Sequence, residues 1–272
     1  MNTYPNNDLE ILIATMNRSD LYFLESIFQQ PLIEITANVV VINQSKSHLI
    51  TTNSENIKVI NSSEFGLSKS RNLAITNSSA ALCWIMDDDC VILPDAIKNI
   101  IEAHHRIPST IITFQTETTK KEKLYYNYFS RKQSHTKKSL YTVLSPEITF
   151  KRKGLLGQGL KFNESFGLGA DFQDSENFVF LNDAFYQDRS PYFYNQTVVR
   201  HEELNSSQEA TNDRVIYARG AIAAYLKHNI TFKKWKYGFF LFRKGLVLST
   251  SELRRKIKTF ENGANDYLKS IN

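Results

Sequence analysis

The sequence predicts an α/β protein in which helices flank a mostly parallel central sheet. Two observations indicate this fold class. Short apolar runs that carry little charge begin at Leu9, Asn38, Ile57 and Ala81, and such runs suit strands buried on both faces of a parallel sheet. Helix-like segments lie between some of these runs, which gives the order β-α-β-β-α-β of a nucleotide-binding half-domain.

The individual elements follow from apolar spacing and from turn residues. We expect strands at 9–14, 38–42, 57–60, 81–86, 111–115 and 191–199, and helices at 21–28, 67–77 and 96–105. The segment 151–159 lacks the Gly-Lys-Ser/Thr ending of a phosphate-binding loop, so we expect turns that join strands. The spacing in 207–228 predicts a long helix with a local break at Gly220.

Composition narrows the class of protein. The chain has 272 residues, of which 42% are hydrophobic and 22% charged, as in ordinary globular proteins. A net charge of +5 favours phosphate-bearing partners. We expect no nucleic-acid partner, because no nucleic-acid-binding motif accompanies the basic clusters. The first residues lack the layout of a secretory signal, and Cys83 and Cys90 indicate reduced thiols, so we expect a cytoplasmic protein.

Three consecutive carboxylates, Asp87, Asp88 and Asp89, end the apolar run that begins at Ala81. They lie just past the carboxyl end of a predicted central strand, where open α/β sheets bind their ligands. Adjacent carboxylates repel one another unless a cation lies among them. A solvated acidic turn is the alternative. The position after a buried strand favours a divalent metal.

Four motifs follow one another along residues 1–115. They are Ala14-Thr-Met-Asn-Arg18, the segment 39–45 ending in Ile-Asn-Gln-Ser, the segment 65–75 with Ser-Lys-Ser-Arg-Asn, and Trp84-Ile-Met-Asp-Asp-Asp89. Their order and spacing resemble family-2 glycosyltransferases, which have the GT-A fold. One departure is that Asn43-Gln44 stand where the family usually has an acidic residue at the nucleotide base, although amides can also pair with a uracil edge.

The resemblance implies a nucleoside diphosphate sugar, with a UDP-sugar favoured, bound by Thr15, Arg18, Asn43, Arg71, Asp87 and Asp88. It also implies Mn²⁺ or Mg²⁺ held against the diphosphate, with Asp89 and Asp87 as ligands. The guanidinium of Arg71 presents a fork of donors suited to phosphate oxygens. The alternative for Arg71 is a surface arginine that pairs with Glu64 or stays solvated.

The segment 162–181 resembles a second family block, in which a glycine-containing turn precedes an acidic pair at the start of a helix. Asp174 or Ser175 is the predicted helix cap. The alignment places Glu176 at the position of the catalytic base, in a first turn where the helix dipole favours an ionised carboxylate. A register error of a few residues would assign the base to Asp174 or Asp171, and a purely structural role for Glu176 is the remaining alternative.

His201 follows the predicted strand 191–199. In several GT-A enzymes a histidine after this strand completes the metal shell, and a neutral imidazole beside carboxylates suits Mn²⁺. A polar residue at a strand end is the alternative. Upstream, the irregular segment 116–138 carries the aromatic run Tyr125–Phe129, which indicates either a surface loop or a cover over an acceptor site.

Aromatic and cationic residues alternate from Thr231 to Phe242, and basic residues continue to Lys256. This mixture is typical of an interfacial membrane segment, so the chain could contact the inner face of a membrane through 231–256. A helix packed on the core, with lysines extending to solvent, is the alternative.

Together these features predict a GT-A domain at 1–228, with a nucleotide-sugar-binding half (1–115) and an acceptor-side half (116–228), and a basic, aromatic helical extension at 229–272. The expected activity is metal-dependent, inverting transfer of a hexosyl or N-acetylhexosaminyl group to a hydroxyl of a cell-surface glycan or glycolipid. A sugar-phosphate nucleotidyltransferase would need a Gly-x-Gly-Thr-Arg loop after the first strand, which this chain lacks. A catalytically silent GT-A-fold protein that binds glycans or acts as a scaffold is the other alternative.

Overall fold

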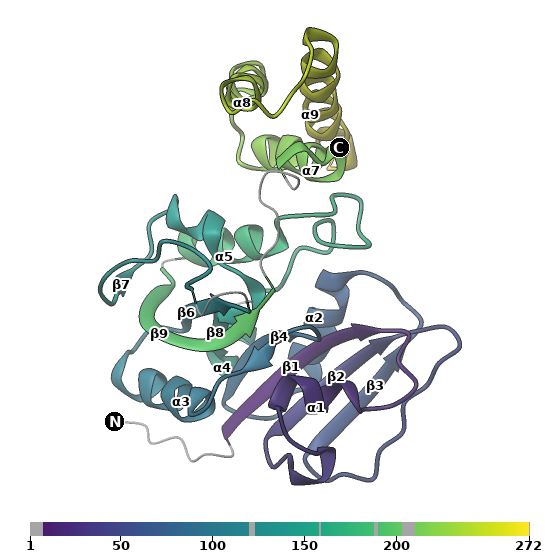
Figure 1. The fold of residues 1–272 in the computed structure, drawn as a ribbon, viewed down its shortest axis with the longest axis vertical. Helices are drawn as coiled ribbons and strands as arrows, with labels where there is room; N and C mark the ends of the chain where they lie inside the picture. The colour runs from purple at the N-terminus through teal and green to yellow at the C-terminus, as the bar shows by residue number, and fades with distance from the viewer. Residues whose placement is uncertain (1–7, 120–122, 158, 188–189, 203–209, 272) are drawn as a thin grey trace.

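A computed structural model describes residues 8–119, 123–157, 159–187, 190–202 and 210–271. In this part of the chain a sheet with the strand order β3-β2-β1-β4-β8-β6-β9-β5 has helices on both faces, and β7 pairs with β9 at its side. A group of three helices, α7, α8 and α9, lies beyond the sheet and its flanking helices (Figure 1). The predicted fold class is therefore confirmed.

The first half of the sheet is parallel. Its strands are β1 (Leu9–Met16), β2 (Asn38–Gln44), β3 (Ile57–Ser62) and β4 (Leu82–Asp87), and its helices are α1 (Phe23–Phe28) and α2 (Leu67–Asn77). Successive side chains of a strand point to opposite faces, so Leu12 packs in the hydrophobic core that contains α2, while Ile11 and Ile13 pack in the core that contains α1. Both faces are covered, as the uncharged runs predict.

The second half of the sheet mixes strand directions. It contains β5 (Val91–Ile92), β6 (Ile111–Thr118), β7 (Gln133–Ser134), β8 (Ile148–Lys151) and β9 (Tyr192–His201). Strand β8 lies antiparallel between β4 and β6, whereas β6 and β9 are parallel. The helices here are α3 (Ala96–Arg106), α4 (Arg152–Leu156) and α5 (Glu176–Tyr186). Short 3₁₀ turns lie at η2 (Leu32–Glu34), η3 (Ser139–Thr142) and η4 (Ser145–Glu147).

Two expectations about this region need correction. The segment 151–159 was expected to form turns only, but residues Arg152–Leu156 form α4, because the turn buries Leu155 completely in the core. His201 was expected to follow a strand, but it is the last residue of β9, because this strand pairs with β6 as far as Thr118.

Three further helices are α7 (Asp213–Tyr225), α8 (Ile230–Arg243) and α9 (Thr250–Ser270). The predicted break at Gly220 is wrong, because α7 continues through it. A Cβ atom at Gly220 would lie 1.9 Å from the carbonyl oxygen of Phe260, and one at Gly263 would lie 1.9 Å from that of Tyr217. The two glycines therefore let the backbones of α7 and α9 touch.

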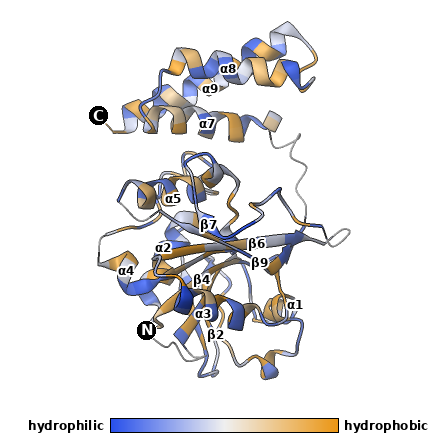
Figure 2. Cartoon of the chain, turned by 90° about the vertical axis from the view of Figure 1, so that its left-hand side faces the viewer, coloured by the Kyte–Doolittle hydropathy of each residue, from blue (hydrophilic) through white to orange (hydrophobic). Residues whose placement is uncertain are grey.

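Figures 1 and 2 both place α7 between the sheet domain and the pair α8 and α9. Helix α7 thus packs with α8 and α9. The predicted domain boundary at residue 228 assigns α7 to the sheet domain instead, and that boundary stays a prediction. Residues 207–209 of the predicted long helix lie outside the described residues. In the described parts of the chain, every helix is too short or too polar to cross a membrane.

Candidate active site

Polar side chains collect at the carboxyl edge of the parallel half-sheet. In register, Thr15 of β1 lies beside Asn43 of β2, and Ala14 lies beside Asp87 of β4. The apolar runs of the three strands end at neighbouring positions of the sheet, because the strands extend beyond the hydrophobic core there. The predicted donor-binding residues therefore come together, as expected for this edge of an open sheet.

Arg71 of α2 lies at the centre of a buried ion-pair network. Its side chain is 2% exposed. The Nη2 atom lies 2.9 Å from Oδ1 of Asp87, and Nη1 lies 3.0 Å from both Oε1 of Glu176 and Oδ1 of Asn177. Burial alone would lower the pKa of Arg71, but the carboxylates of Asp87 and Glu176 raise it above its usual value, so the guanidinium stays charged.

This network excludes the surface alternative for Arg71, since Glu64 pairs with Lys69 instead, at 3.0 Å. The second carboxylate oxygen of Asp87 accepts a hydrogen bond from the hydroxyl of Ser145 in η4. Both oxygens of Asp87 are thereby held by residues from distant parts of the chain. The buried guanidinium of Arg71 requires these carboxylates, of which Glu176 is 11% exposed and Asp87 26% exposed, because an unpaired buried charge is strongly unfavourable.

A second, more exposed group surrounds Asp88. Its Oδ2 accepts a hydrogen bond from the Thr15 hydroxyl at 2.5 Å and lies 3.0 Å from Nη2 of Arg18, whose side chain is 43% exposed. Asn43 is fully buried and holds the backbone of Arg18, accepting from its N–H at 3.1 Å and donating to its carbonyl at 3.0 Å. The Asn43 amide also donates to His48 and Asn61, so its contacts favour a role in positioning Arg18.

Asp89 and His201 form the candidate metal centre. Nε2 of His201 lies 3.3 Å from Oδ1 of Asp89, whose side chain is 65% exposed. Their hydrogen bond lowers the pKa of Asp89 and raises that of His201, as expected when an anion faces a protonated imidazole. A carboxylate and an imidazole at an open edge are a donor set that fits Mn²⁺ or Mg²⁺.

Cys90 is the third side chain within reach of a shared ion. Burial raises the pKa of its thiol far above the usual range, so it remains a neutral thiol and a poor ligand for a hard cation. Asp87 does not belong to this group of side chains, and its two oxygens are bonded to Arg71 and Ser145. Asp87 as a metal ligand stays a prediction, and its contacts favour a role in holding Arg71.

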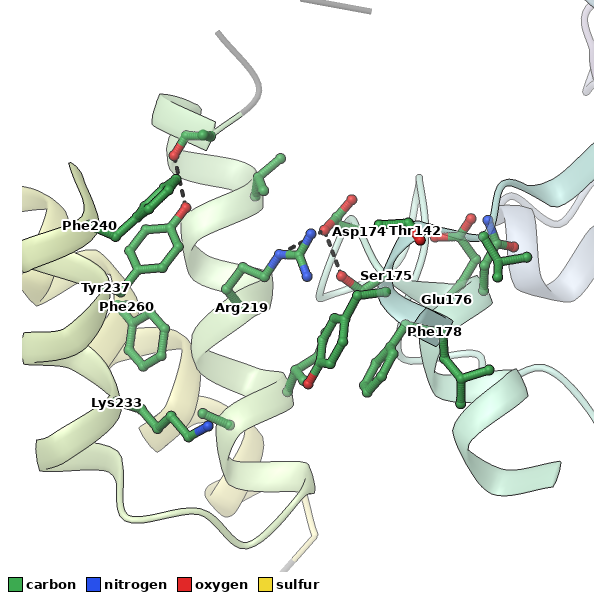
Figure 3. A pocket seen from close by; sticks show the side chains of 18 of the residues that line it. Thr142, Asp174, Ser175, Glu176, Phe178, Arg219, Lys233, Tyr237, Phe240 and Phe260 are labelled. Atoms are coloured by element: carbon green, nitrogen blue, oxygen red, sulfur yellow. Dashed lines mark hydrogen bonds and ion pairs between the residues drawn. The ribbon is translucent and has the colours of Figure 1, made fainter. Parts of the chain in front are cut away.

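A cavity of about 980 Å³ opens beside the network, between the sheet domain and the helices α7 and α8. One wall carries Asp174, Ser175 and Glu176 at the start of α5, and the opposite wall carries Arg219 of α7 (Figure 3). Asp174 accepts a hydrogen bond from Ser175 at 2.6 Å and lies 3.7 Å from Nε of Arg219. Ser175 precedes the helix at φ 68°, and its hydroxyl caps no backbone N–H.

The two predicted catalytic carboxylates differ in their surroundings. The Glu176 side chain is 11% exposed and pairs with the buried Arg71, whereas the Asp174 side chain is 27% exposed. The third candidate, Asp171, is exposed and does not line the cavity. Sequence reasoning missed Ser145, Asn177 and Arg219. Only Asn177 carried a signal, its position next to Glu176, because the other two come from segments without a motif.

Aromatic side chains line the rest of the cavity. They include Tyr126 of the segment 116–138, Tyr141 of η3, and Tyr237 and Phe240 of α8. Tyr141 stacks on Phe178 with ring centroids 3.8 Å apart. Tyr125 lines the cavity beside Tyr126, so this part of the segment 116–138 borders the cavity. Residues 120–122 of that segment lie outside the described residues.

A parallel half-sheet with carboxylates at its carboxyl edge, joined to a mixed half-sheet, is the arrangement of the GT-A fold. The chain belongs to glycosyl transferase family 2, whose sequence pattern matches residues 10–168, more than half of the protein. The resemblance seen in the sequence is thus confirmed. A comparison with curated protein sequences finds no significant match.

Solved structures of S. aureus TarS share the fold. TarS 1–349 in complex with UDP-GlcNAc has a TM-score of 0.61 and 15% identity, covering 97% of this chain and 81% of that one. The complex with UDP has a TM-score of 0.53 and 14% identity, covering 96% and 91%. A longer TarS structure has a TM-score of 0.60 and 16% identity, and this chain spans about half of it, 49%, while 97% of this chain is covered.

Proposed function

We propose that this protein transfers a hexosyl or N-acetylhexosaminyl group from a nucleoside diphosphate sugar to a hydroxyl acceptor. The observation that carries this proposal is the Arg71 network, which ties Asp87 at the end of β4 to the start of α5 beside a large cavity. Membership of glycosyl transferase family 2 supports the reaction class. The TarS structures that hold UDP-GlcNAc and UDP support a UDP-sugar as the donor.

Donor binding is assigned to the edge of the parallel half-sheet. Arg18 presents a partly exposed guanidinium, which suits the oxygens of a diphosphate. Thr15 and Asp88 fix the position of that guanidinium, and Asn43 holds its backbone. Asp87 and Arg71 provide the rigid floor of this site, because each is bonded on several sides.

Asp89 and His201 would hold a divalent cation, Mn²⁺ or Mg²⁺, at the mouth of the donor site. When bound, the cation offsets the negative charge of the departing diphosphate. His201 has to be neutral to bind it, so the proton shared with Asp89 must leave first. His201 and Asp89 come from β9 and from the turn after β4, so the correct pairing of the sheet holds the two ligands together.

We assign the general base to Asp174 rather than to Glu176. A base must reach the acceptor hydroxyl and take its proton. Both carboxylates line the cavity, but Glu176 is 11% exposed and pairs with the buried Arg71 at 3.0 Å, whereas Asp174 is 27% exposed and lies 3.7 Å from Arg219 (Figure 3). In a single displacement, the acceptor oxygen attacks the anomeric carbon as Asp174 removes its proton, and the bond to the diphosphate breaks, which inverts the configuration. Glu176 positions the start of α5 through Arg71.

The acceptor is assigned to the cavity, where Tyr126, Tyr141 and Tyr237 offer aromatic faces to sugar rings. A glycan or a lipid-linked glycan fits this lining. A peripheral contact of residues 231–256 with the inner face of a membrane belongs to the same proposal, supported by the exposed aromatic side chains of α8. The alternative, a silent GT-A-fold protein, is disfavoured by the intact carboxylates at Asp89, Asp174 and Glu176.

The test measures nucleotide release from a panel of UDP-sugars and other nucleoside diphosphate sugars in the presence of Mn²⁺. We expect slow release from one or a few donors, loss of release with EDTA, and a strong decrease in Asp174→Asn. A protein that binds a donor but releases no nucleotide above background under any condition would instead be a silent binding protein.

A further inference from the structure

Helix α8 presents a stripe of four exposed aromatic side chains. Phe232, Trp235, Phe239 and Phe242 are 64%, 58%, 63% and 66% exposed. Their spacing of three, four and three residues places them on one side of the helix. Scattered exposed apolar residues are ordinary, but four large aromatic groups on one helix face indicate an interaction surface.

The other faces of α8 already have partners. Leu241 is fully buried, a Cβ atom at Gly238 would meet Ile257 of α9 at 2.7 Å, and Lys234 pairs with Glu261 at 2.6 Å. A third face, with Lys233, Tyr237 and Phe240, lines the cavity (Figure 3). The aromatic stripe is therefore the face of α8 that no described residue covers.

The charged residues near the aromatic stripe indicate the chemistry of its binding partner. Between Lys227 and Ser251 the sequence has no aspartate or glutamate. By helical spacing the exposed cations Lys236 and Arg243 adjoin the stripe, and the exposed Lys244 caps the C-terminal end of the helix. A symmetric contact with a second copy of this chain would bring these cations against one another, which is unfavourable. Aromatic side chains beside exposed cations instead complement an anionic lipid surface, where the rings enter the interface and the cations meet headgroups.

We propose that the protein docks on an anionic membrane through this stripe, with α8 lying in the plane of the interface. Leu248, which is 96% exposed, is a further exposed apolar side chain in the segment that follows the helix. This assignment specifies which side of α8 makes the proposed membrane contact. The helix face that lines the cavity adjoins the stripe, so the cavity opens close to the lipid surface, and an acceptor carried on a lipid could reach Asp174 from the bilayer. This last consequence rests on the proposed transferase function.

The chain contains its own reporter. It has two tryptophans, and Trp84 is fully buried in β4 whereas Trp235 lies in the stripe. The experiment adds vesicles of phosphatidylcholine, or of phosphatidylcholine with phosphatidylglycerol at a ratio of about 7:3, to the full chain and measures tryptophan emission and co-sedimentation. We expect a blue shift and binding with the anionic vesicles only, both weakening as salt increases.

The double variant Phe232→Ser/Phe239→Ser should bind these vesicles on the order of ten-fold less tightly, because two aromatic groups no longer enter the interface. The matched control is Ile33→Ser/Leu49→Ser, which removes two exposed apolar side chains from the sheet domain, 93% and 64% exposed, and should bind as the wild type does. Thermal unfolding of each variant verifies the fold, and nucleotide release without vesicles verifies the transferase function separately.

Equal binding of the Phe232→Ser/Phe239→Ser variant and the wild type would overturn the proposal, as would the absence of binding to anionic vesicles. A dimer in solution that dissociates in this variant would assign the stripe to a second copy instead. If nucleotide release fails in every protein while vesicle binding follows the pattern above, the membrane assignment stands and the transferase function falls.

Discussion

Arg71 and Glu176 form a buried ion pair across 105 residues of sequence, with 3.0 Å between Nη1 and Oε1. The pair joins α2 of the parallel half-sheet to α5 at the cavity. Since Arg71 also pairs with Asp87, the same guanidinium joins the proposed donor site to the helix that carries Glu176. We therefore expect stability and activity both to depend on this side chain.

Arg71→Ala should reduce the free energy of unfolding by about 3–5 kcal/mol, because it leaves the buried carboxylate of Glu176 and the partly buried carboxylate of Asp87 without a cation. Denaturation in urea measures this loss. Arg18→Ala is the control, since that arginine is 43% exposed and should cost less than about 1 kcal/mol. Equal losses in both variants would contradict the central place of Arg71.

Asp174→Asn should lower the transfer rate by about 10²- to 10⁴-fold while donor affinity persists, because asparagine cannot accept the acceptor's proton. Glu176→Gln should instead lower stability, since it removes the charge that pairs with Arg71, and should affect transfer much less. Rates and donor affinities of both variants decide the assignment. A Glu176→Gln enzyme that binds donor and folds normally but transfers as poorly as expected of Asp174→Asn would return the base to Glu176.

Asp89→Asn should abolish the thermal stabilisation that Mn²⁺ and UDP together give the wild type, with little change in the stability of the free protein. A carboxylate at an exposed edge contributes little to folding, so the variant should remain native. Asp95→Asn, a change of a nearby exposed carboxylate, serves as the control. Turnover that persists in Asp89→Asn with a chelator present would refute a metal at this position.

Gly220→Ala should destabilise the protein by about 1–3 kcal/mol or more, because the new methyl group would meet the Phe260 carbonyl oxygen in the backbone of α9. Gly238→Ala is the matched change within a helix. There the nearest atom is Cδ1 of Ile257, the end of a flexible side chain, so the loss should be smaller. Urea denaturation of both variants compares them, and a larger loss in Gly238→Ala would contradict the close crossing of α7 and α9.

Burial raises the pKa of Glu147 to about 8, although its carboxylate also accepts hydrogen bonds from Tyr128 and from the N–H of Leu144. Between the usual value of 4.5 and about 8 the folded protein keeps this proton while the unfolded chain releases it. The contribution of Glu147 to stability therefore falls as pH rises through that window, by up to about 1.4 kcal/mol per pH unit.

Glu147→Gln should remove this slope, so its stability relative to the wild type should increase from pH 5 to pH 8. Urea denaturation at several pH values measures the difference. The buried His104 and His135, whose pKa values burial lowers to about 3 and about 4, act in the opposite direction, but equally in both proteins. A difference that does not change with pH would show that Glu147 is ionised throughout.

The sequence by itself determined the parallel half of the sheet. Its strands are recognisable because each is an apolar run buried on both faces, and burial of this kind depends on local composition. The same reasoning placed Asp87, Asp88 and Asp89 at a strand end, and the order of four motifs gave the family. The short strands β5, β7 and β8 escaped prediction, because two to four residues carry no periodic pattern.

The tertiary structure decided which of these residues meet. The sequence showed Arg71 only as an arginine inside a helix, and tertiary packing places Asp87, Glu176 and Asn177 against it. Gly220 looked like a break because glycine weakens an isolated helix, and only the approach of α9 gives it another role. Asp174 and Glu176, two residues apart, differ because one faces Arg219 in the cavity and the other the buried Arg71. Contacts between distant segments determine the ion pairs of a side chain, its burial and its access to the cavity, and no local sequence pattern encodes such contacts.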